Sequence, residues 1–186
     1  MRKSLRLLVA GFFVVMFFSV VVQQAMAQQW IWYPEAGGNP LESAPAATRY
    51  FVKVVTVDAI KSASLEITAD NSYKLYINGK MIGEGKKWEE ATVYNLAKNL
   101  VKGKNVIAIE ATNVDGPAGI IFKGKITPAA GKSISLDSSS KWLSSDKATK
   151  GWLEGTTDKT WLKALELANF GEGPWGANVV SKTMGQ

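Results

Sequence analysis

Short apolar segments separated by turn residues are the feature that most constrains the fold of this chain. The stretch Ile67 to Gly85 reads ITADNSYKLYINGKMIGEG and places two apolar runs on either side of Asn78-Gly79. Asn-Gly is the strongest short signal for a hairpin, because a type I′ turn needs positive φ at both central residues. A two-residue loop pairs Ile77 with Lys80 and Leu75 with Ile82, which predicts that the face carrying Leu75 and Ile77 points inward.

Further strand-like segments repeat this pattern along the chain. They are Arg49 to Val57, Ser62 to Ala69, Lys104 to Asn113 and Ala118 to Ile126, each bounded by turn residues. Thr92 to Asn105 is expected to be a turn or single helical turn, and Trp161 to Leu167 a strand. Close spacing of short strands predicts an all-β sandwich.

The first 27 residues predict a signal peptide. Arg2, Lys3 and Arg6 precede an uncharged apolar run from Leu7 to Val22, and Ala25-Met26-Ala27 has the small-x-small pattern of a cleavage site. An uncleaved anchor is the alternative, although Gln23-Gln24 end the run early. The expected organisation is a signal peptide at 1–27, a β-sandwich at 28–178 and a flexible tail at 179–186, in a secreted or periplasmic protein with no membrane span after cleavage.

Composition excludes several kinds of chemistry. The chain has no Cys and no His, so it has no thiol nucleophile, no His-based triad and no usual zinc or copper site. Oxygen-liganded calcium remains compatible with the sequence. Loss of the three basic signal residues lowers the formal net charge from +6 to +3, and the remaining Lys residues are dispersed. Nucleic acid is therefore not an expected partner.

Several segments in order resemble the galactose-binding-like jelly-roll domain. They are TRYFVKVVTV, ADNSYKLYINGKMIGEG, YNLAKNLVKGKNVIAIEATN, AGIIFKGKI and the closing DKTWLKALELANFGEGPWG. This domain occurs as the sugar-binding domain of β-galactosidases and β-glucuronidases and as an accessory domain of α-L-rhamnosidases. The resemblance implies a two-sheet antiparallel sandwich, often with calcium and sometimes with bound carbohydrate, whereas catalysis belongs to a separate barrel domain.

The hairpin ADNSYKLYING is also similar to the lectin-like domain first described in anthrax protective antigen. In that domain paired acidic residues hold a calcium ion that binds sugar. The corresponding pair here is Asp70-Asn71, so these two residues are the expected metal ligands. The alternative is that both side chains cap a turn by bonding the local backbone.

Tryptophan is the other candidate for sugar contact, because its flat face stacks on the apolar face of a pyranose. Trp30, Trp32 and Trp161 lie in apolar strands and are expected in the core, and Trp175 is expected to anchor the chain end. Trp88 lies in a polar loop, where exposure and a place in the core are equally open, and Trp142 and Trp152 are secondary candidates.

The sequence thus predicts an exported, non-catalytic carbohydrate-binding module. Its expected ligand-binding residues are Trp88, Asn113, Asp115 and Trp152. A protein-interaction or structural subunit of a cell-envelope assembly, with an envelope protein as its partner, is the alternative. A hydrolase is the third possibility.

Overall fold

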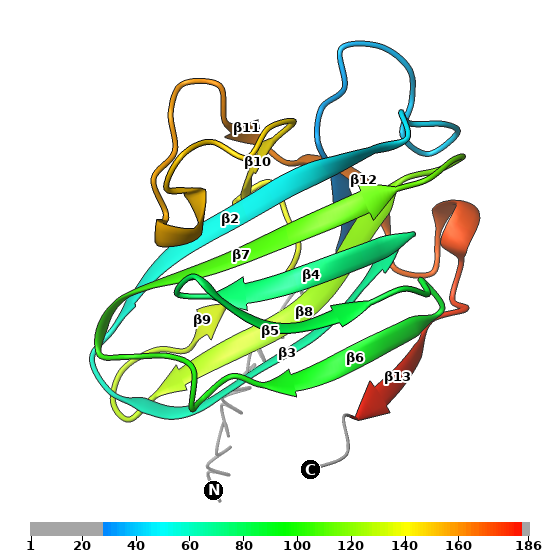
Figure 1. Ribbon diagram of the computed structural model, residues 1–186. Coiled ribbons are helices and arrows are strands. Elements are labelled where there is room, and N and C mark those ends of the chain that lie inside the picture. Colours follow the sequence, from blue (N-terminus) through cyan, green and yellow to red (C-terminus); the bar gives the residue numbers. More distant parts are fainter. Residues whose placement is uncertain (1–27, 184–186) are drawn as a thin grey trace, which may run out of the picture.

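A computed structural model describes residues 28–183. The signal peptide expected at 1–27 lies outside the described residues. Two sheets pack face to face as a β-sandwich (Figure 1), which confirms the predicted fold class. Every strand pair within 28–183 is antiparallel except the pairing of the last strand, β13, with β6.

The first sheet has seven strands. Their order is β12 (Leu165–Asn169), β1 (Gln29–Trp32), β8 (Gly119–Pro128), β3 (Ile60–Asp70), β6 (Glu90–Asn95) and β13 (Val180–Thr183), with β9 (Ile134–Ser135) paired to β8. The chain end thus supplies both β12 and β13, and in Figure 1 β13 runs beside β6.

The second sheet has six strands. Their order is β11 (Leu162–Lys163), β10 (Leu143–Ser145), β2 (Ala47–Val57), β7 (Gly103–Asn113), β4 (Ser72–Ile77) and β5 (Lys80–Gly85). Two short 3₁₀ helices complete the described elements: η1 (Trp152–Glu154) and η2 (Gly173–Trp175). Within residues 28–183 no helix is long and apolar enough to cross a membrane.

The main core lies between the sheets and follows from the period-2 alternation of the long strands. In β7, Ile107, Ile109 and Ala111 point inward and are fully buried, and Leu65 and Ile67 of β3 face them. Trp32 is buried in this core as expected, and Trp142 is buried there too, whereas Trp30, Trp161 and Trp175 are buried in two smaller clusters outside it. The two sheets are therefore held together by apolar burial, in keeping with a chain that has no Cys.

The hairpin register differs from the prediction in one detail. Asn78 and Gly79 have φ of 52° and 80°, and Ile77 pairs with Lys80 as expected. A bulge then shifts the register, so that Leu75 pairs with Gly83 instead of Ile82. The ring of Tyr94 explains why glycine stands there, because a Cβ at Gly83 would lie 2.5 Å from the Tyr94 hydroxyl oxygen.

Two other segments also differ from the sequence-based expectation. Thr92 to Asn95, expected in a turn, belong to strand β6, and only the residues after it form the turn into β7. The expected tail at 179–186 includes β13, which pairs in parallel with β6 from Val180↔Glu90 to Thr183↔Val93. The edge of β6 offers free backbone groups, and the chain end satisfies them.

Candidate functional site

Several loops meet at one end of the sandwich, which we call the calcium-type end because the expected metal ligands Asp70 and Asn71 lie there. The β3–β4 turn at Asp70 and Asn71 meets the exit of β7 at Asn113 through two hydrogen bonds. Asn71 N donates to Thr112 O at 2.9 Å, and Val114 N donates to Asn71 Oδ1 at 2.6 Å. The Asp70–Asn71 peptide bond is cis. Two candidate residues that are distant from Asn113 in sequence are thus adjacent to it in the fold.

Asp70 is a buried carboxylate with a strong partner on one oxygen. Trp175 Nε1 donates to its Oδ2 at 2.9 Å, and the residue is 8% exposed. Burial raises the pKa of Asp70 above its ordinary value; the Trp175 hydrogen bond opposes this, and the negative charges of Glu89 and Asp115 add to it. These acidic groups create a negative potential at this end, which a cation would relieve.

Asn113 has the most informative side chain at the calcium-type end. Its Nδ2 donates to Ala44 O at 3.0 Å and to Pro45 O at 3.3 Å, which fixes the orientation of the amide. Its Oδ1 is buried and has no hydrogen-bond partner; within residues 28–183 the indole nitrogen of Trp30 is the other such atom. A buried acceptor without a donor is costly, so this oxygen has unused capacity for a ligand.

The chemistry of these donors suits a hard cation. Asp70, Asn71 and Asn113 offer carboxylate and amide oxygens, which are the ligands that calcium prefers. Within residues 28–183 no group of three or more His, Cys, Asp or Glu side chains could hold a metal ion, so the amide oxygens would have to take part. Asn71 Oδ1 accepts one hydrogen bond and, as a carbonyl oxygen, keeps a second lone pair.

Trp88 and Asp115 lie at the same end. Thr68 Oγ1, from the strand that leads to Asp70, hydrogen-bonds Lys87 O at 3.1 Å and Trp88 O at 3.0 Å, which holds the Trp88 loop in place. The Trp88 side chain is partly buried and packs on a cluster of Trp30, Ile121 and Trp175. Asp115 is exposed in the turn between β7 and β8.

Trp30 and Trp175 form the base of that cluster. Their rings stack with centroids 4.0 Å apart, and both residues are buried. Trp175 thereby links the chain end to β1 and also holds the carboxylate of Asp70. Trp88 retains part of its surface in solvent, so the loop residue is the tryptophan of this cluster that is open to a ligand.

The structure places Trp152 elsewhere. It was expected to bind ligand with Trp88, Asn113 and Asp115, but it is 8% exposed and packs on the outer face of the second sheet, apart from them. Val52, Val106 and Ala108 form the apolar patch that it covers, and Trp161 packs beside it. The indole is buried because the outward positions of β2 and β7 are apolar at this point.

Sequence reasoning missed four residues next to Trp152. Tyr50 and Tyr76 contact the Trp152 ring edge-on, with centroids 5.1 Å and 6.0 Å away. Lys74 Nζ donates to Glu110 Oε1 at 2.8 Å, and Tyr76 OH donates to Glu110 Oε2 at 3.5 Å. The available signal was that all four occupy outward positions of strands whose alternate residues are apolar.

The electrostatics of this cluster follow from burial and from Glu110. Burial raises the pKa of both Tyr50 and Tyr76, and the negative charge of Glu110 raises it further, whereas Lys74 opposes the shift. Both phenols are therefore neutral hydrogen-bonding groups at neutral pH.

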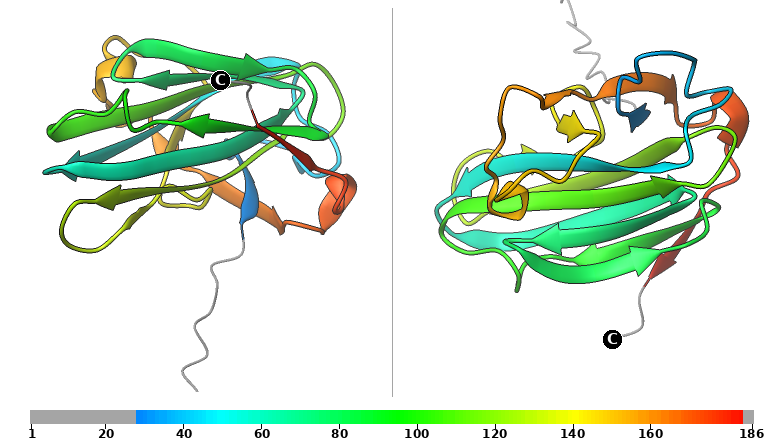
Figure 2. Two further views of the ribbon diagram at one scale, coloured as in Figure 1. Left: turned by 90° about the horizontal axis from the view of Figure 1, so that it is seen from below. Right: turned by 45° about the horizontal axis from the view of Figure 1, so that its top comes forward.

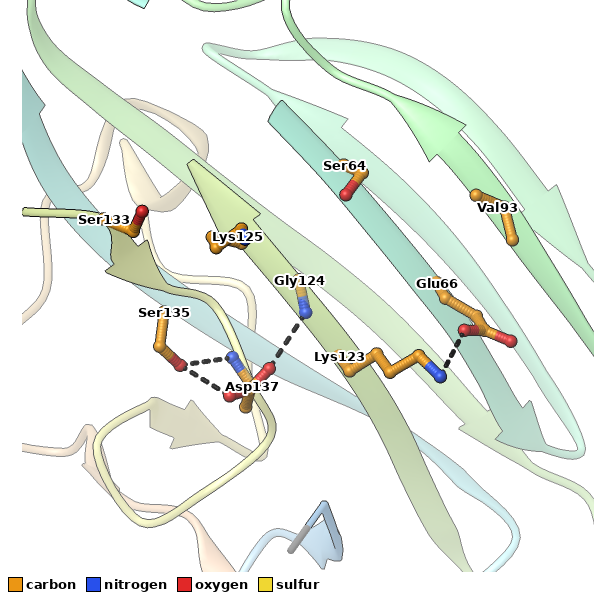
Figure 3. Close-up of a pocket in the computed structure, with 9 residues that line it drawn as sticks. All are labelled: Ser64, Glu66, Val93, Lys123, Gly124, Lys125, Ser133, Ser135 and Asp137. Carbon is orange, nitrogen blue, oxygen red and sulfur yellow. Dashed lines mark hydrogen bonds and ion pairs between the residues drawn. The ribbon is translucent and has the colours of Figure 1, made fainter. Parts of the chain in front are cut away.

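A shallow pocket of about 390 Å³ lies on the outer face of the first sheet (Figure 3). Its two carboxylates already have partners: Lys123 Nζ and Ser181 Oγ bind Glu66, while Gly124 N and Ser135 Oγ bind Asp137. Its lining contains no aromatic side chain. The pocket therefore lacks both the stacking surface and the free acceptors found at the calcium-type end.

Comparison with known proteins finds similarity to part of an α-L-rhamnosidase and to a lectin. No protein-family model matches it. An α-L-rhamnosidase of Streptomyces avermitilis is 38% identical over 158 residues, which cover 79% of this chain and 15% of the enzyme. The crystal structure of S. avermitilis α-L-rhamnosidase complexed with L-rhamnose has a TM-score of 0.72 and 35% identity over 82% of this chain and 16% of that chain.

A lectin is equally similar in structure. The Pleurotus ostreatus lectin, solved in complex with GalNAc, has a TM-score of 0.74 and 32% identity over 82% of this chain and 45% of that chain. The chain thus spans about 15% of the curated rhamnosidase and under half of the lectin chain. Rhamnosidase domains and a lectin are the neighbours expected of a galactose-binding-like sugar-binding β-sandwich, which confirms the resemblance seen in the sequence.

Proposed function

We propose that this protein is an exported carbohydrate-binding module without catalysis of its own, and that it binds glycan at the calcium-type end. The observation that carries the proposal is that one end of the sandwich holds the Asp70–Asn71 turn, the unpartnered Oδ1 of Asn113 and the loop of the partly exposed Trp88. Sugar recognition needs both features, because hydroxyl groups require polar partners and the C–H face of the ring requires an apolar one.

Calcium is part of this proposal. Asp70 would supply a carboxylate oxygen, Asn71 and Asn113 would supply amide oxygens, and Asp115 would add negative charge near the site. The buried Oδ1 of Asn113 supports this assignment, since a cation would satisfy an acceptor that has no donor. A bound calcium ion supplies a positive charge that attracts sugar hydroxyl oxygens.

The chain's own residues would orient the sugar beside that ion. Trp88 is held by the Thr68 hydrogen bonds and by its packing on Trp175, so its ring has little freedom to lose on binding. The same Trp175 binds Asp70, which couples the position of the stacking surface to that of the carboxylate.

The extent of the similarity favours binding over hydrolysis. The chain corresponds to about one-sixth of the rhamnosidase, and the lectin is similar over most of this chain. Glycoside hydrolysis commonly needs two carboxyl groups that flank the scissile bond, with one free to donate a proton. Asp70 is instead buried against Trp175, while Asp115 is exposed in a turn, so we assign neither of them an acid–base role.

Calorimetric titration of the purified protein with L-rhamnose and with GalNAc tests the proposal, with calcium and with chelator. We expect binding of one of these sugars with calcium and its loss with chelator. Asn113→Ala and Trp88→Ala should each weaken it, whereas Val101→Ala, an exposed apolar residue at the opposite end, should leave it unchanged. A glycan array extends the search to other sugars, and a folded protein that binds no glycan on it would contradict the proposal and favour the protein-interaction alternative.

A further inference from the structure

The outer face of the second sheet begins at the loops of the calcium-type end. Strands β2, β7 and β4 lie side by side there, as both Figure 1 and the right panel of Figure 2 show. Their registered pairs form three rows across the strands: Thr48–Thr112–Ser72, Tyr50–Glu110–Lys74 and Val52–Ala108–Tyr76. The first row is next to the candidate ligands along the backbone, because Thr112 precedes Asn113 and Ser72 follows Asn71.

Side chains along these rows change from polar to aromatic with distance from that end. Thr48 Oγ1 and Thr112 Oγ1 are hydrogen-bonded at 2.8 Å in the first row. Tyr50 and Tyr76 follow, and both rings are partly exposed where they meet the edge of Trp152. The step from Thr112 to Ala108 spans roughly 13 Å along the strand, which is several times the width of one pyranose ring.

Charged groups in the middle row are within reach of a ligand. The side chains of Lys74 and Glu110 are 44% and 23% exposed, and the bond between them is a partly solvated ion pair. Such pairs contribute little to stability, so their donors and acceptors can be shared with ligand hydroxyl groups at small cost. The Tyr76 hydroxyl, at 3.5 Å from Glu110 Oε2, makes only a weak bond that a ligand could replace.

We propose that this face, the Tyr50–Tyr76 track, binds the inner residues of a glycan chain whose terminal sugar occupies the calcium-type end. The inference rests on the proposed function and extends it from a single sugar to an oligosaccharide or polysaccharide. Partly exposed tyrosine rings offer stacking surface, while Glu110, Lys74 and the threonine row offer hydroxyl partners. This mixture suits a saccharide better than a protein, because the centre of a protein interface is depleted of charged residues.

A comparison of short and long ligands tests the track. The probes are L-rhamnose, GalNAc, and oligosaccharides of three or four residues that end in each of these sugars, all titrated in calcium. We expect the matching oligosaccharide to bind about tenfold more tightly than its terminal sugar. Tyr76→Ala should remove most of that gain and leave the affinity for the single sugar unchanged.

Two further variants keep the result interpretable. Val54→Ala alters an exposed apolar residue of β2 on the same sheet, outside the track, and should change neither affinity. Glu110→Gln keeps the size of the side chain. It should lower the affinity for the oligosaccharide by about threefold and leave the affinity for the single sugar unchanged. If circular dichroism shows that Tyr76→Ala is unfolded, Glu110→Gln takes its place in the test.

The outcomes separate the two proposals. Equal affinity for the single sugar and the oligosaccharide, or a Tyr76→Ala effect that is the same for both, would overturn the track and leave the terminal site intact. No binding of any probe would remove the terminal site for these sugars, and the track would fall with it.

Discussion

The two ends of strand β7 carry buried asparagines with opposite hydrogen bonding. At the hairpin end, Asn105 Oδ1 accepts from Val101 N at 2.8 Å and from Asn78 Nδ2 at 3.0 Å, while its Nδ2 donates to Val101 O and Gly103 O. At the calcium-type end, Asn113 Nδ2 has two acceptors, whereas Oδ1 has no donor. The two residues are equally buried, at 0% and 1% exposure.

This difference separates a polar side chain whose hydrogen bonds are all made within the fold from one that has capacity left for a ligand. Asn105 uses all four of its hydrogen-bonding positions to join a turn, a hairpin and a strand, so it has no capacity left for a ligand. Asn113 is held rigidly through its nitrogen and presents an unused oxygen, and that arrangement is costly unless something binds there. Asn105 and Asn113 are the same residue type and are equally buried, so only their hydrogen bonds distinguish them.

The largest expected effect is a loss of stability at the hairpin end, where Asn105 makes all of its hydrogen bonds. Asn105→Ala should lower the free energy of unfolding by about 3 kcal/mol, because it removes four hydrogen bonds and leaves the partly buried polar groups of Val101, Gly103 and Asn78 without these partners. Urea denaturation measures this loss. Asn113→Ala, in chelator, should cost about 1 kcal/mol, since it removes two hydrogen bonds and also an unsatisfied acceptor; equal losses at the two ends would refute the comparison.

Calcium should stabilise the protein through the calcium-type end. At a concentration a hundredfold above its dissociation constant it should raise the free energy of unfolding by about 2.7 kcal/mol, the value expected for a ligand that binds only the folded state. Asn113→Ala should abolish this gain, whereas Asn78→Ala at the hairpin end should lower stability with and without calcium by the same amount. Thermal unfolding with calcium and with chelator measures both, and a calcium gain that persists in Asn113→Ala would contradict the assignment.

The framework of the molecule could be predicted from sequence because it depends on local patterns. Alternation in β7 and the Asn78-Gly79 turn determine which residues face the core and where the chain reverses. The glycine opposite Leu75 could not be explained from local sequence, since the space there is filled by Tyr94, which comes from the other sheet. Strand β13 was missed for a similar reason, because a four-residue segment becomes a strand only when β6 offers it an edge.

The candidate site could be predicted in its residue types but not in its geometry. Asp70, Asn71, Asn113, Asp115 and Trp88 come from three separate loops, and only the fold brings them to one end. Trp88 and Trp152 both lie in polar segments and both were expected to bind ligand, Trp152 as a secondary candidate. The difference arises from the apolar outward residues Val52, Val106 and Ala108, which belong to strands distant in sequence and bury the Trp152 ring.

A smaller effect sharpens the assignment of Trp88. Trp88→Ala should weaken sugar binding about tenfold, because it removes the exposed stacking surface at the calcium-type end. It should change stability by less than Trp175→Ala does, since Trp175 is fully buried, stacks on Trp30 and binds Asp70. Titration paired with urea denaturation gives both quantities; an unchanged sugar affinity would mean that Trp88 serves only as packing for the cluster.

The smallest expected effect concerns the charge on Asp70. Because its pKa in the folded state is raised, chiefly by burial, the ionised carboxylate lowers stability at neutral pH when no cation is bound. As the pH falls through that raised pKa towards the ordinary value of 3.8, the folded state takes up the proton before the unfolded state does, and this penalty disappears. Asp70→Asn carries no charge at any pH and can still accept the hydrogen bond from Trp175.

In chelator, Asp70→Asn should therefore be more stable than the wild type at pH 7, by less than about 1 kcal/mol, and the difference should shrink in acid. Urea denaturation at several pH values measures it. With calcium the wild type should become the more stable of the two. Its Asp70 carboxylate can bind the ion, whereas the variant has no charged ligand at this position. A carboxylate that destabilises the calcium-free protein and stabilises the calcium-bound protein is placed for a ligand, as the unused oxygen of Asn113 is. If the wild type is instead more stable than Asp70→Asn in chelator at pH 7, Asp70 belongs to the framework, as Asn105 does.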